Sequence, residues 1–318
     1  LLSGSGAGLS CFFAGAARWG GVRDDVLGPY VPLIIVNCLI ISRCEACSSK
    51  QGLGPAIGDA LGMFLYSLSR LPLHLALVQA KVSHANIRAI DTTQAEQMPG
   101  VKKVVTHKDI KGKNRITGLI TFPTNKGDGW DRPILCDEKV FQYGDAIAIV
   151  CADSQDQAQA AAAKVKVELE KLPAYMSAPA AMAEDAMEIH PGTPNVYFTQ
   201  NIAKGADTKP VFEQAAAVVE DDFFVGRQPH MPMEPDVGFA YLNDEGKLCI
   251  HSKSIGLHLH AAMIAPGLGV DAEKLFLIQN PAGGTFGYKF SPTMEALLGV
   301  AAMATGRPVF LRYNYQQH

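Results

Sequence analysis

Hydrophobic and polar residues form short regular patterns from Leu73 onwards, and these patterns predict strands that alternate with helices. Ser154 is a suitable N-cap for an alanine-rich helix, and a shorter helical stretch ends at 98–100. Apolar or alternating stretches predict strands at 73–82, 101–110, 145–153 and 165–174. Interleaved strands and helices of this kind indicate a mixed α/β (α+β) fold.

A second patterned region begins near Val196. Its helix from Ser291 is the best marked, because Ser291 occupies the N-cap, Pro292 the first helical position and Gly306 the position after the end. One face of this helix is apolar, with Met294, Leu297, Leu298, Ala301 and Ala302. The other predicted elements are a hairpin at 236–254 turning at 244–246, a helix at 256–269 closed by Gly267 and Gly269, and strands at 216–226, 274–280 and 308–315.

Residues 1–72 do not share this patterning. They hold four of the seven cysteines and 11 of the 30 glycines, and no helical or alternating period persists there. The apolar run 31–41 is about half the length of a membrane-spanning helix, so no membrane association is expected. We therefore divide the chain into a separate N-terminal segment (1–72), a first domain (73–178), a linker (179–195) and a second domain (196–318).

Composition narrows the possible partners and compartment. The chain has 318 residues, a net charge of -3 and no lysine- or arginine-rich run, which argues against nucleic-acid binding. Seven cysteines at irregular spacing do not form a disulfide framework, so a reducing, cytoplasmic compartment is expected. Cys44 and Cys47 lack the second pair or histidines of a metal site, and no metal ligands are predicted.

The stretch GGTFGYKF, residues 283–290, is the candidate binding loop. It lies between a predicted strand and a helix start, where glycines allow a ligand to approach free backbone N–H groups. Its spacing matches neither a nucleotide-triphosphate loop nor a dinucleotide fingerprint, so an anionic cofactor loop and an ordinary tight turn both stay open. In an extended segment Phe286 and Phe290 would point to one side and Tyr288 to the other. Such rings either wall a small apolar pocket beside the loop or pack in the core, and packing in the core is the expectation from the sequence alone.

Other polar residues carry weaker signals. Glu234 and Asp236 follow His230 closely, and either orient it or are solvated loop charges. His258 and His260 lie two apart on a predicted helix and do not share a face, so they make a poor metal pair. No serine or cysteine nucleophile has a visible base, and no catalytic residue is assigned.

Several long phrases of the sequence resemble one family. LHLALVQAKVSHANIRAIDT, VGRQPHMPMEPDV, HSKSIGLHLH and GGTFGYKFSPTMEAL are similar to the aldehyde-oxidising members of the xanthine oxidase family of molybdenum hydroxylases from sulfate-reducing bacteria. The resemblance is nearly continuous from about residue 73 to residue 317. It implies an α/β-hammerhead domain at 73–178, followed by the truncated start of the molybdopterin-binding domain.

The resemblance also implies cofactors and site residues. The family oxidises aldehydes to carboxylic acids with water as the oxygen source, passes electrons through two [2Fe–2S] clusters, and is expected to form homodimers. Phe286 would offer its backbone N–H near the apical oxygen on molybdenum, and Phe290 would line the substrate funnel. The residues implied to lie against the molybdopterin cytosine dinucleotide are Gly283, Gly284, Thr285, Phe286 and Gly287.

The chain departs from the family pattern in two respects. Residues 1–72 do not resemble the family or its iron–sulfur domains, which suggests a shifted reading frame or an assembly junction before Leu73, and we expect these residues to be poorly ordered. The family's catalytic glutamate belongs to sequence beyond His318. We therefore expect a fragment that is inactive on its own. The alternative is a non-catalytic hammerhead-fold module for binding or assembly.

Overall fold

The computed structural model describes residues 71–117, 132–196, 199–226, 228–230 and 232–317. Residues Pro72–His318 form one compact unit. The expectations of poor order and of a frame error before Leu73 concern residues 1–72, which lie almost wholly outside the described part of the chain.

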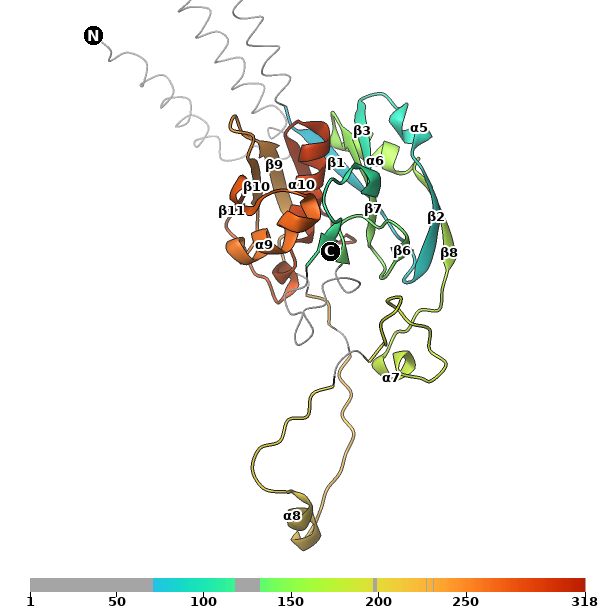
Figure 1. The fold of residues 1–318 in the computed structure, drawn as a ribbon, viewed down its shortest axis with the longest axis vertical. Helices are drawn as coiled ribbons and strands as arrows, with labels where there is room; N and C mark the ends of the chain where they lie inside the picture. The colour runs from blue at the N-terminus through green and yellow to red at the C-terminus, as the bar shows by residue number, and fades with distance from the viewer. Residues whose placement is uncertain (1–70, 118–131, 197–198, 227, 231, 318) are drawn as a thin grey trace, which may run out of the picture. The chain divides into compact units, whose positions relative to one another are not determined.

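A mixed sheet forms the centre of this unit (Figure 1). Within the described residues it has seven strands in the order β11-β10-β9-β12-β1-β7-β3. The pairs β1–β12 and β10–β11 are parallel, and the other neighbours are antiparallel. The strands are β1 (Leu73–Gln79), β3 (Val101–Thr106), β7 (Ala146–Ala152), β9 (Val237–Leu242), β10 (Leu248–Ser252), β11 (Leu275–Gln279) and β12 (Val309–Arg312). Strands from both predicted domains therefore share one sheet, and the division at residue 178 stays a prediction.

Three helices cover the central sheet. Helix α10 (Thr293–Thr305) packs on β9, β10 and β12, helix α9 (Leu257–Leu268) packs on β11 and α10, and α6 (Gln155–Ala162) packs on β1 and β7. The predicted apolar face of α10 is fully buried: Met294, Leu297, Leu298, Ala301 and Ala302. This face and the sheet form one continuous core, whose apolar area is the main stabilising contribution to the fold.

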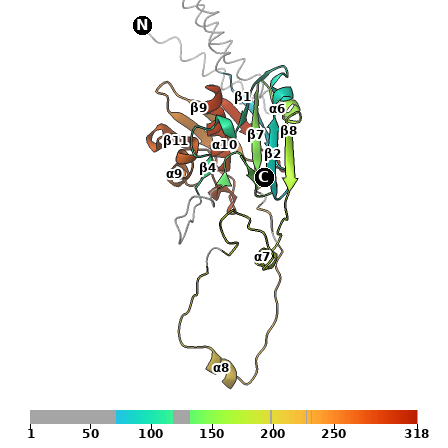
Figure 2. The ribbon, with the colours of Figure 1, turned by 45° about the vertical axis from the view of Figure 1, so that its right-hand side comes forward.

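Smaller elements flank the central sheet (Figure 2). A three-stranded sheet has the order β6-β2-β8, and β4 pairs with β5. These strands are β2 (Ala85–Asp91), β4 (Arg115–Ile116), β5 (Arg132–Pro133), β6 (Lys139–Val140) and β8 (Lys166–Lys171). The short helices are α5 (Thr93–Glu96), α7 (Ala178–Ala181), α8 (Lys209–Gln214), η1 (His107–Asp109), η2 (Ala272–Lys274) and η3 (Tyr288–Phe290).

Most predicted elements are present, with three corrections. Residues 216–226 are exposed and form no strand with any described residue. No described strand lies beside the apolar residues of this segment to form backbone hydrogen bonds with them. Helix α10 is capped by Pro292 and not by Ser291, since a short 3-10 turn precedes it. Strand β2 was missed, because its sequence ANIRAID alternates only weakly.

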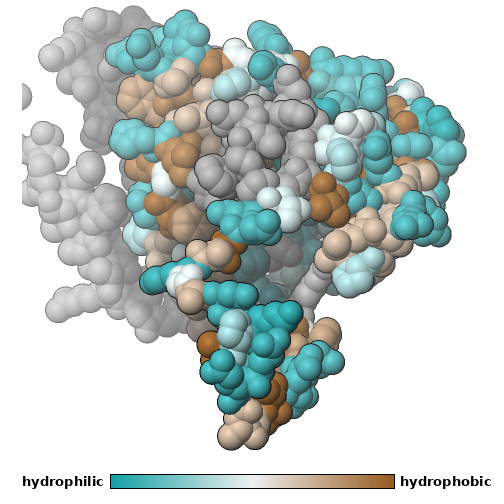
Figure 3. All heavy atoms as spheres, turned by 60° about the horizontal axis from the view of Figure 1, so that its bottom comes forward, coloured by the Kyte–Doolittle hydropathy of each residue, from teal (hydrophilic) through white to brown (hydrophobic). Residues whose placement is uncertain are grey.

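The segment around α8 exposes large apolar side chains. Phe223 and Phe224 are 88% and 94% exposed, and Val219 is 91% exposed. Figure 3, which brings this end of the molecule forward, shows apolar side chains among polar ones at the surface. Uncovered apolar side chains that lie close together in this way are typical of a surface that contacts another protein segment.

Glycines allow a close backbone contact between residues 112–115 and helix α9. A Cβ atom on Gly267 would lie 2.0 Å from the carbonyl oxygen of Arg115, and one on Gly112 would lie 2.1 Å from the backbone nitrogen of Gly269. The N–H of Asn114 donates to the carbonyl of Gly267 at 3.0 Å. Because backbone meets backbone here, no side chain can move aside to admit a methyl group.

We expect Gly267→Ala to lower the free energy of unfolding by about 1–3 kcal/mol, measured by urea denaturation. Helix propensity alone predicts the opposite sign, since alanine is favoured over glycine inside a helix by about 1 kcal/mol. The matched control is Gly226→Ala, where the added methyl group would meet nothing within 4 Å. A Gly267→Ala protein as stable as the parent would contradict the tight contact.

Candidate functional site

The glycine loop leaves β11 and reaches α10 through the 3-10 turn η3. Its backbone enters the left-handed region three times, at Gly284 (φ 123°), Phe286 (φ 48°) and Gly287 (φ 94°). The expectation of an extended segment with alternating sides is therefore wrong. Glycine tolerates such angles without strain, but phenylalanine does so rarely, which marks Phe286 as a strained position.

The aromatic residues of the loop lie outside the core. Phe286 is 70% exposed and Phe290 is 49% exposed, so the expectation that they pack in the core is wrong. Tyr288 is partly buried, and burial together with the nearby Asp236 and Glu295 raises the pKa of its hydroxyl. The two exposed rings leave apolar surface beside the loop, as a pocket wall would require.

The loop presents a row of free backbone donors. Within the described residues, no acceptor meets the N–H groups of Gly284, Thr285, Phe286 and Gly287. The next N–H groups are already used, since Tyr288 donates to the Thr285 carbonyl at 2.9 Å. Successive unpaired amides around left-handed residues form a concave site for anions or ligand oxygens.

Glu234 lies against the start of this loop. Its Oε1 accepts the N–H of Gly283 at 2.6 Å, and its Oε2 lies 2.6 Å from the ammonium of Lys253. Oε1 also pairs with the ammonium of Lys289, whose side chain is only 3% exposed. Glu234 is therefore neither a solvated loop charge nor an orienting partner of His230.

These donors control the protonation of Glu234. Burial alone would raise the pKa of its carboxyl, but the donors from Lys253, Lys289 and Gly283 outweigh burial and lower the pKa to about 2. Sequence reasoning missed this role, because 49 residues separate Glu234 from Gly283. The sequence carries no local signal for this role, because the two lysines that pair with Glu234 are also distant along the chain.

A buried polar layer lies below the loop. The hydroxyl of Ser252 donates to Glu295 Oε1 at 2.6 Å, and the hydroxyl of Ser254 lies 2.6 Å from His260 Nδ1. Burial raises the pKa of Glu295 and lowers that of His260, so each favours its neutral form. His258 on the same helix is exposed, so the two histidines do not share a face of the helix.

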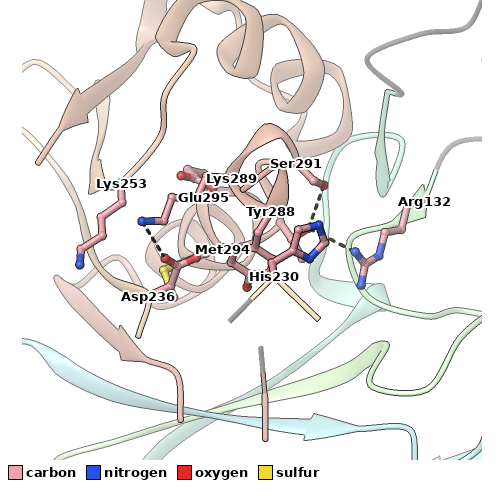
Figure 4. A pocket seen from close by; sticks show the side chains of 11 residues that line it. Arg132, His230, Asp236, Lys253, Tyr288, Lys289, Ser291, Met294 and Glu295 are labelled. Atoms are coloured by element: carbon pink, nitrogen blue, oxygen red, sulfur yellow. Dashed lines mark hydrogen bonds and ion pairs between the residues drawn. The ribbon is translucent and has the colours of Figure 1, made fainter. Parts of the chain in front are cut away.

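A cavity of about 170 Å³ opens beside η3 and the start of α10 (Figure 4). Arg132 reaches it from the first region, where its guanidinium bonds Thr293 Oγ1 at 3.3 Å and Asp145 at 3.2 Å. The other labelled side chains come from the later part of the chain. The lining residues are Arg132, His230, Asp236, Lys253, Gly287, Tyr288, Lys289, Ser291, Thr293, Met294 and Glu295.

The geometry fits a bound anionic or oxygen-rich cofactor better than an ordinary turn. The amides of 284–287 have no acceptor among the described residues, and the nearby Glu234 carboxylate is engaged by its three donors. Among the residues predicted to contact the cofactor, Gly283 differs from its neighbours because its N–H already donates to Glu234. No cluster of metal-ligating side chains occurs among the described residues.

Two family models match consecutive parts of the chain. Residues 68–173 match the a/b hammerhead domain of aldehyde oxidase and xanthine dehydrogenase. Residues 189–318 match the molybdopterin cofactor-binding domain. The two matches follow one another along the chain and leave residues 174–188 between them.

A third model falls on a different part of the chain. Residues 23–88 match the Rnf-Nqr subunit, a membrane protein. The match includes the apolar run 31–41, so the expected lack of membrane association stays a prediction. In the part of the chain that the structure describes, no helix is long and apolar enough to cross a membrane.

Individual relatives agree with the two domain matches. The aldehyde oxidoreductase of Megalodesulfovibrio gigas is 76% identical over 245 residues, which are 77% of this chain and 27% of that protein. The nicotinate dehydrogenase large molybdopterin subunit of Eubacterium barkeri is 32% identical over 237 residues, 74% of this chain and 53% of that protein.

The solved structure of the Desulfovibrio gigas aldehyde oxidoreductase superposes with a TM-score of 0.75 at 72% identity. It covers 82% of this chain, which corresponds to 28% of the enzyme. The chain thus spans about a quarter to a half of the length of these relatives. From residue 68 onwards, the chain belongs to the aldehyde oxidase and xanthine dehydrogenase family of molybdenum hydroxylases, with a hammerhead domain followed by molybdopterin cofactor-binding sequence.

Proposed function

We propose that this chain is part of a molybdenum hydroxylase that oxidises aldehydes to carboxylic acids with water as the oxygen source. The observation that carries the proposal is the row of four free amides at 284–287, held in a segment 76% identical to an aldehyde oxidoreductase. Paired glycines and left-handed angles make these amides accessible to a ligand.

Each residue of the loop has a proposed role. The amides of Gly284, Thr285, Phe286 and Gly287 bind a molybdopterin cytosine dinucleotide, and Gly283 anchors the loop. Phe290 and the ring of Phe286 line the entrance for the aldehyde. The bound cofactor supplies the two-electron oxidation and the oxygen transfer.

Two carboxylates beside the loop, Glu234 and Glu295, are already engaged by other groups of the chain. Glu234 has a pKa of about 2 and is bonded to three donors, so it takes up a proton only in strong acid. Glu295 is buried below η3 and accepts from Ser252. We therefore assign the catalytic glutamate, as well as two [2Fe–2S] clusters, to other parts of the longer enzyme.

The same proposal extends to the compartment, the oligomeric state and the partners of the enzyme. We propose a cytoplasmic, homodimeric enzyme that binds neither nucleic acid nor membrane. The described cysteines, Cys136, Cys151 and Cys249, are buried free thiols, which suits a reducing compartment.

A chimera tests the function directly. Residues 73–317 of this chain replace the matching segment of the Megalodesulfovibrio gigas enzyme, and aldehyde-dependent dye reduction is measured. We expect kcat/KM within about tenfold of the parent, which is a change of about 1.4 kcal/mol in the barrier. A chimera with full molybdenum and pterin content but no turnover would instead support the non-catalytic module.

In the same chimera, we expect Gly284→Val to lower kcat/KM by at least about 100-fold, because a displaced loop misplaces the cofactor. A Cβ atom at Gly284 would lie 3.1 Å from the Phe286 ring, at a φ that valine does not adopt. The control Gly226→Val adds its side chain in open space and should leave turnover unchanged.

The isolated chain should show no aldehyde oxidation with a dye acceptor, because Glu234 is held ionised by three donors and Glu295 is buried and bonded to Ser252, so neither is placed to take a proton from a ligand on the loop. Turnover that scales with the concentration of purified chain would refute this expectation.

The carboxyl of Glu234 should titrate with a midpoint near pH 2, measured by carboxyl ¹³C NMR. Because its pKa is depressed in the folded state, its stabilising contribution is complete above the ordinary value of 4.5 and is lost as the pH falls towards 2. Lys253→Met should move the midpoint upwards. A midpoint at or above 4.5 in the parent chain would contradict the contacts described for Glu234.

A further inference from the structure

Glu234 contacts the glycine loop at both of its ends. At the start it accepts the N–H of Gly283, and at the end it pairs with the ammonium of Lys289. The four free amides at 284–287 lie between these two anchor points. The contacts of this one carboxylate thus fix the separation between the two ends of the loop.

Glycine at position 283 lets the Glu234 carboxylate lie close to the backbone. A Cβ atom on this glycine would lie 3.0 Å from Glu234 Oε2 and 3.2 Å from the carboxyl carbon. Gly283 therefore allows a side chain to approach the backbone closely, whereas Gly284 and Gly287 allow left-handed backbone angles. The two kinds of glycine have separate functions in one loop.

The ion pairs of Glu234 differ from ordinary surface pairs. The side chains of Lys289, Lys253 and Glu234 are 3%, 16% and 22% exposed. A buried ammonium without its partner is strongly unfavourable, so the Lys289 end of the loop depends on the carboxylate. Asp236 forms a second, longer ion pair with the Lys289 ammonium, at 4.0 Å.

Lys253 fixes the carboxylate from the opposite side. It follows the last residue of β10, and its ammonium lies 2.6 Å from Glu234 Oε2, which leaves Oε1 for Gly283 and Lys289. The anchor is thereby tied to the central sheet. A carboxylate held by a regular strand can position a loop that has no regular structure of its own.

We propose that Glu234 is a positioning residue, which clamps both ends of the 283–289 loop so that the four free amides point at the cofactor. The proposal rests on the cofactor-binding function proposed above and adds the group that orients the loop. Glu234 itself does not touch the reacting atoms.

Residue-resolved hydrogen exchange of the cofactor-free chain tests the clamp. We expect Glu234→Ala to speed exchange of the Gly283 amide by at least about tenfold, because a charge-assisted hydrogen bond is lost. The matched control is Glu245→Ala, which removes an exposed partner of Lys247 in the hairpin turn. Unchanged exchange at Gly283 in Glu234→Ala would overturn the proposal.

A double variant separates positioning from general stability. Glu234→Ala leaves the buried Lys289 ammonium with only its 4.0 Å ion pair to Asp236 and should lower the melting temperature, whereas Glu234→Ala with Lys289→Met removes the buried charge and should restore it. In the double variant we expect exchange at Gly283 to stay fast. If exchange returns to the parent rate together with the melting temperature, Glu234 acts only on stability and the proposal fails.

The chimera distinguishes the two proposals. If Glu234→Ala speeds loop exchange but the chimera with this change keeps its pterin content and kcat, the clamp exists and cofactor binding by the loop is wrong. If loop exchange is unaffected while the parental chimera is fully active, the function stands and the clamp is wrong.

Discussion

The close approach of two backbones at Gly112, Gly267 and Gly269 is the constraint on which the site depends. It docks the stretch before β4 onto the carboxyl end of α9 through hydrogen bonds to the carbonyls of residues 266 and 267. β4 pairs with β5, and β5 carries Arg132 to the start of α10. A contact without any side chain thus determines that a residue of the hammerhead region lines the cavity of the cofactor-binding region.

The end of β10 organises the loop from two sides. Side chains alternate along a strand, so Ser252 and Ser254 point into the core, where they bond Glu295 and His260, and Lys253 points the other way to Glu234. The inner contacts are buried and favour neutral partners, whereas the outer contact is ionic. Three consecutive residues therefore connect the rigid sheet both to the helices below the loop and to the carboxylate that holds it.

Local patterns in the sequence were sufficient for the elements whose signals are local. The apolar face of α10, the αL cap at Gly306 and the hairpin of β9 and β10 follow from spacing and turn residues. The strand predicted at 216–226 fails because β-propensity is expressed only where a neighbouring strand supplies hydrogen bonds. The role of Glu234 was not predictable for a related reason, since it depends on three contacts from segments 19 to 55 residues away.

Phe286 gives the strongest physical indication that the loop serves a ligand. A left-handed backbone at a non-glycine residue costs on the order of 1 kcal/mol, and glycine at this position would remove that cost. Burial does not compensate, because the ring is 70% exposed. The side chain therefore contributes little to the stability of this fold, and its presence between Thr285 and Gly287 is better explained by contact with a molecule that approaches the free amides from outside.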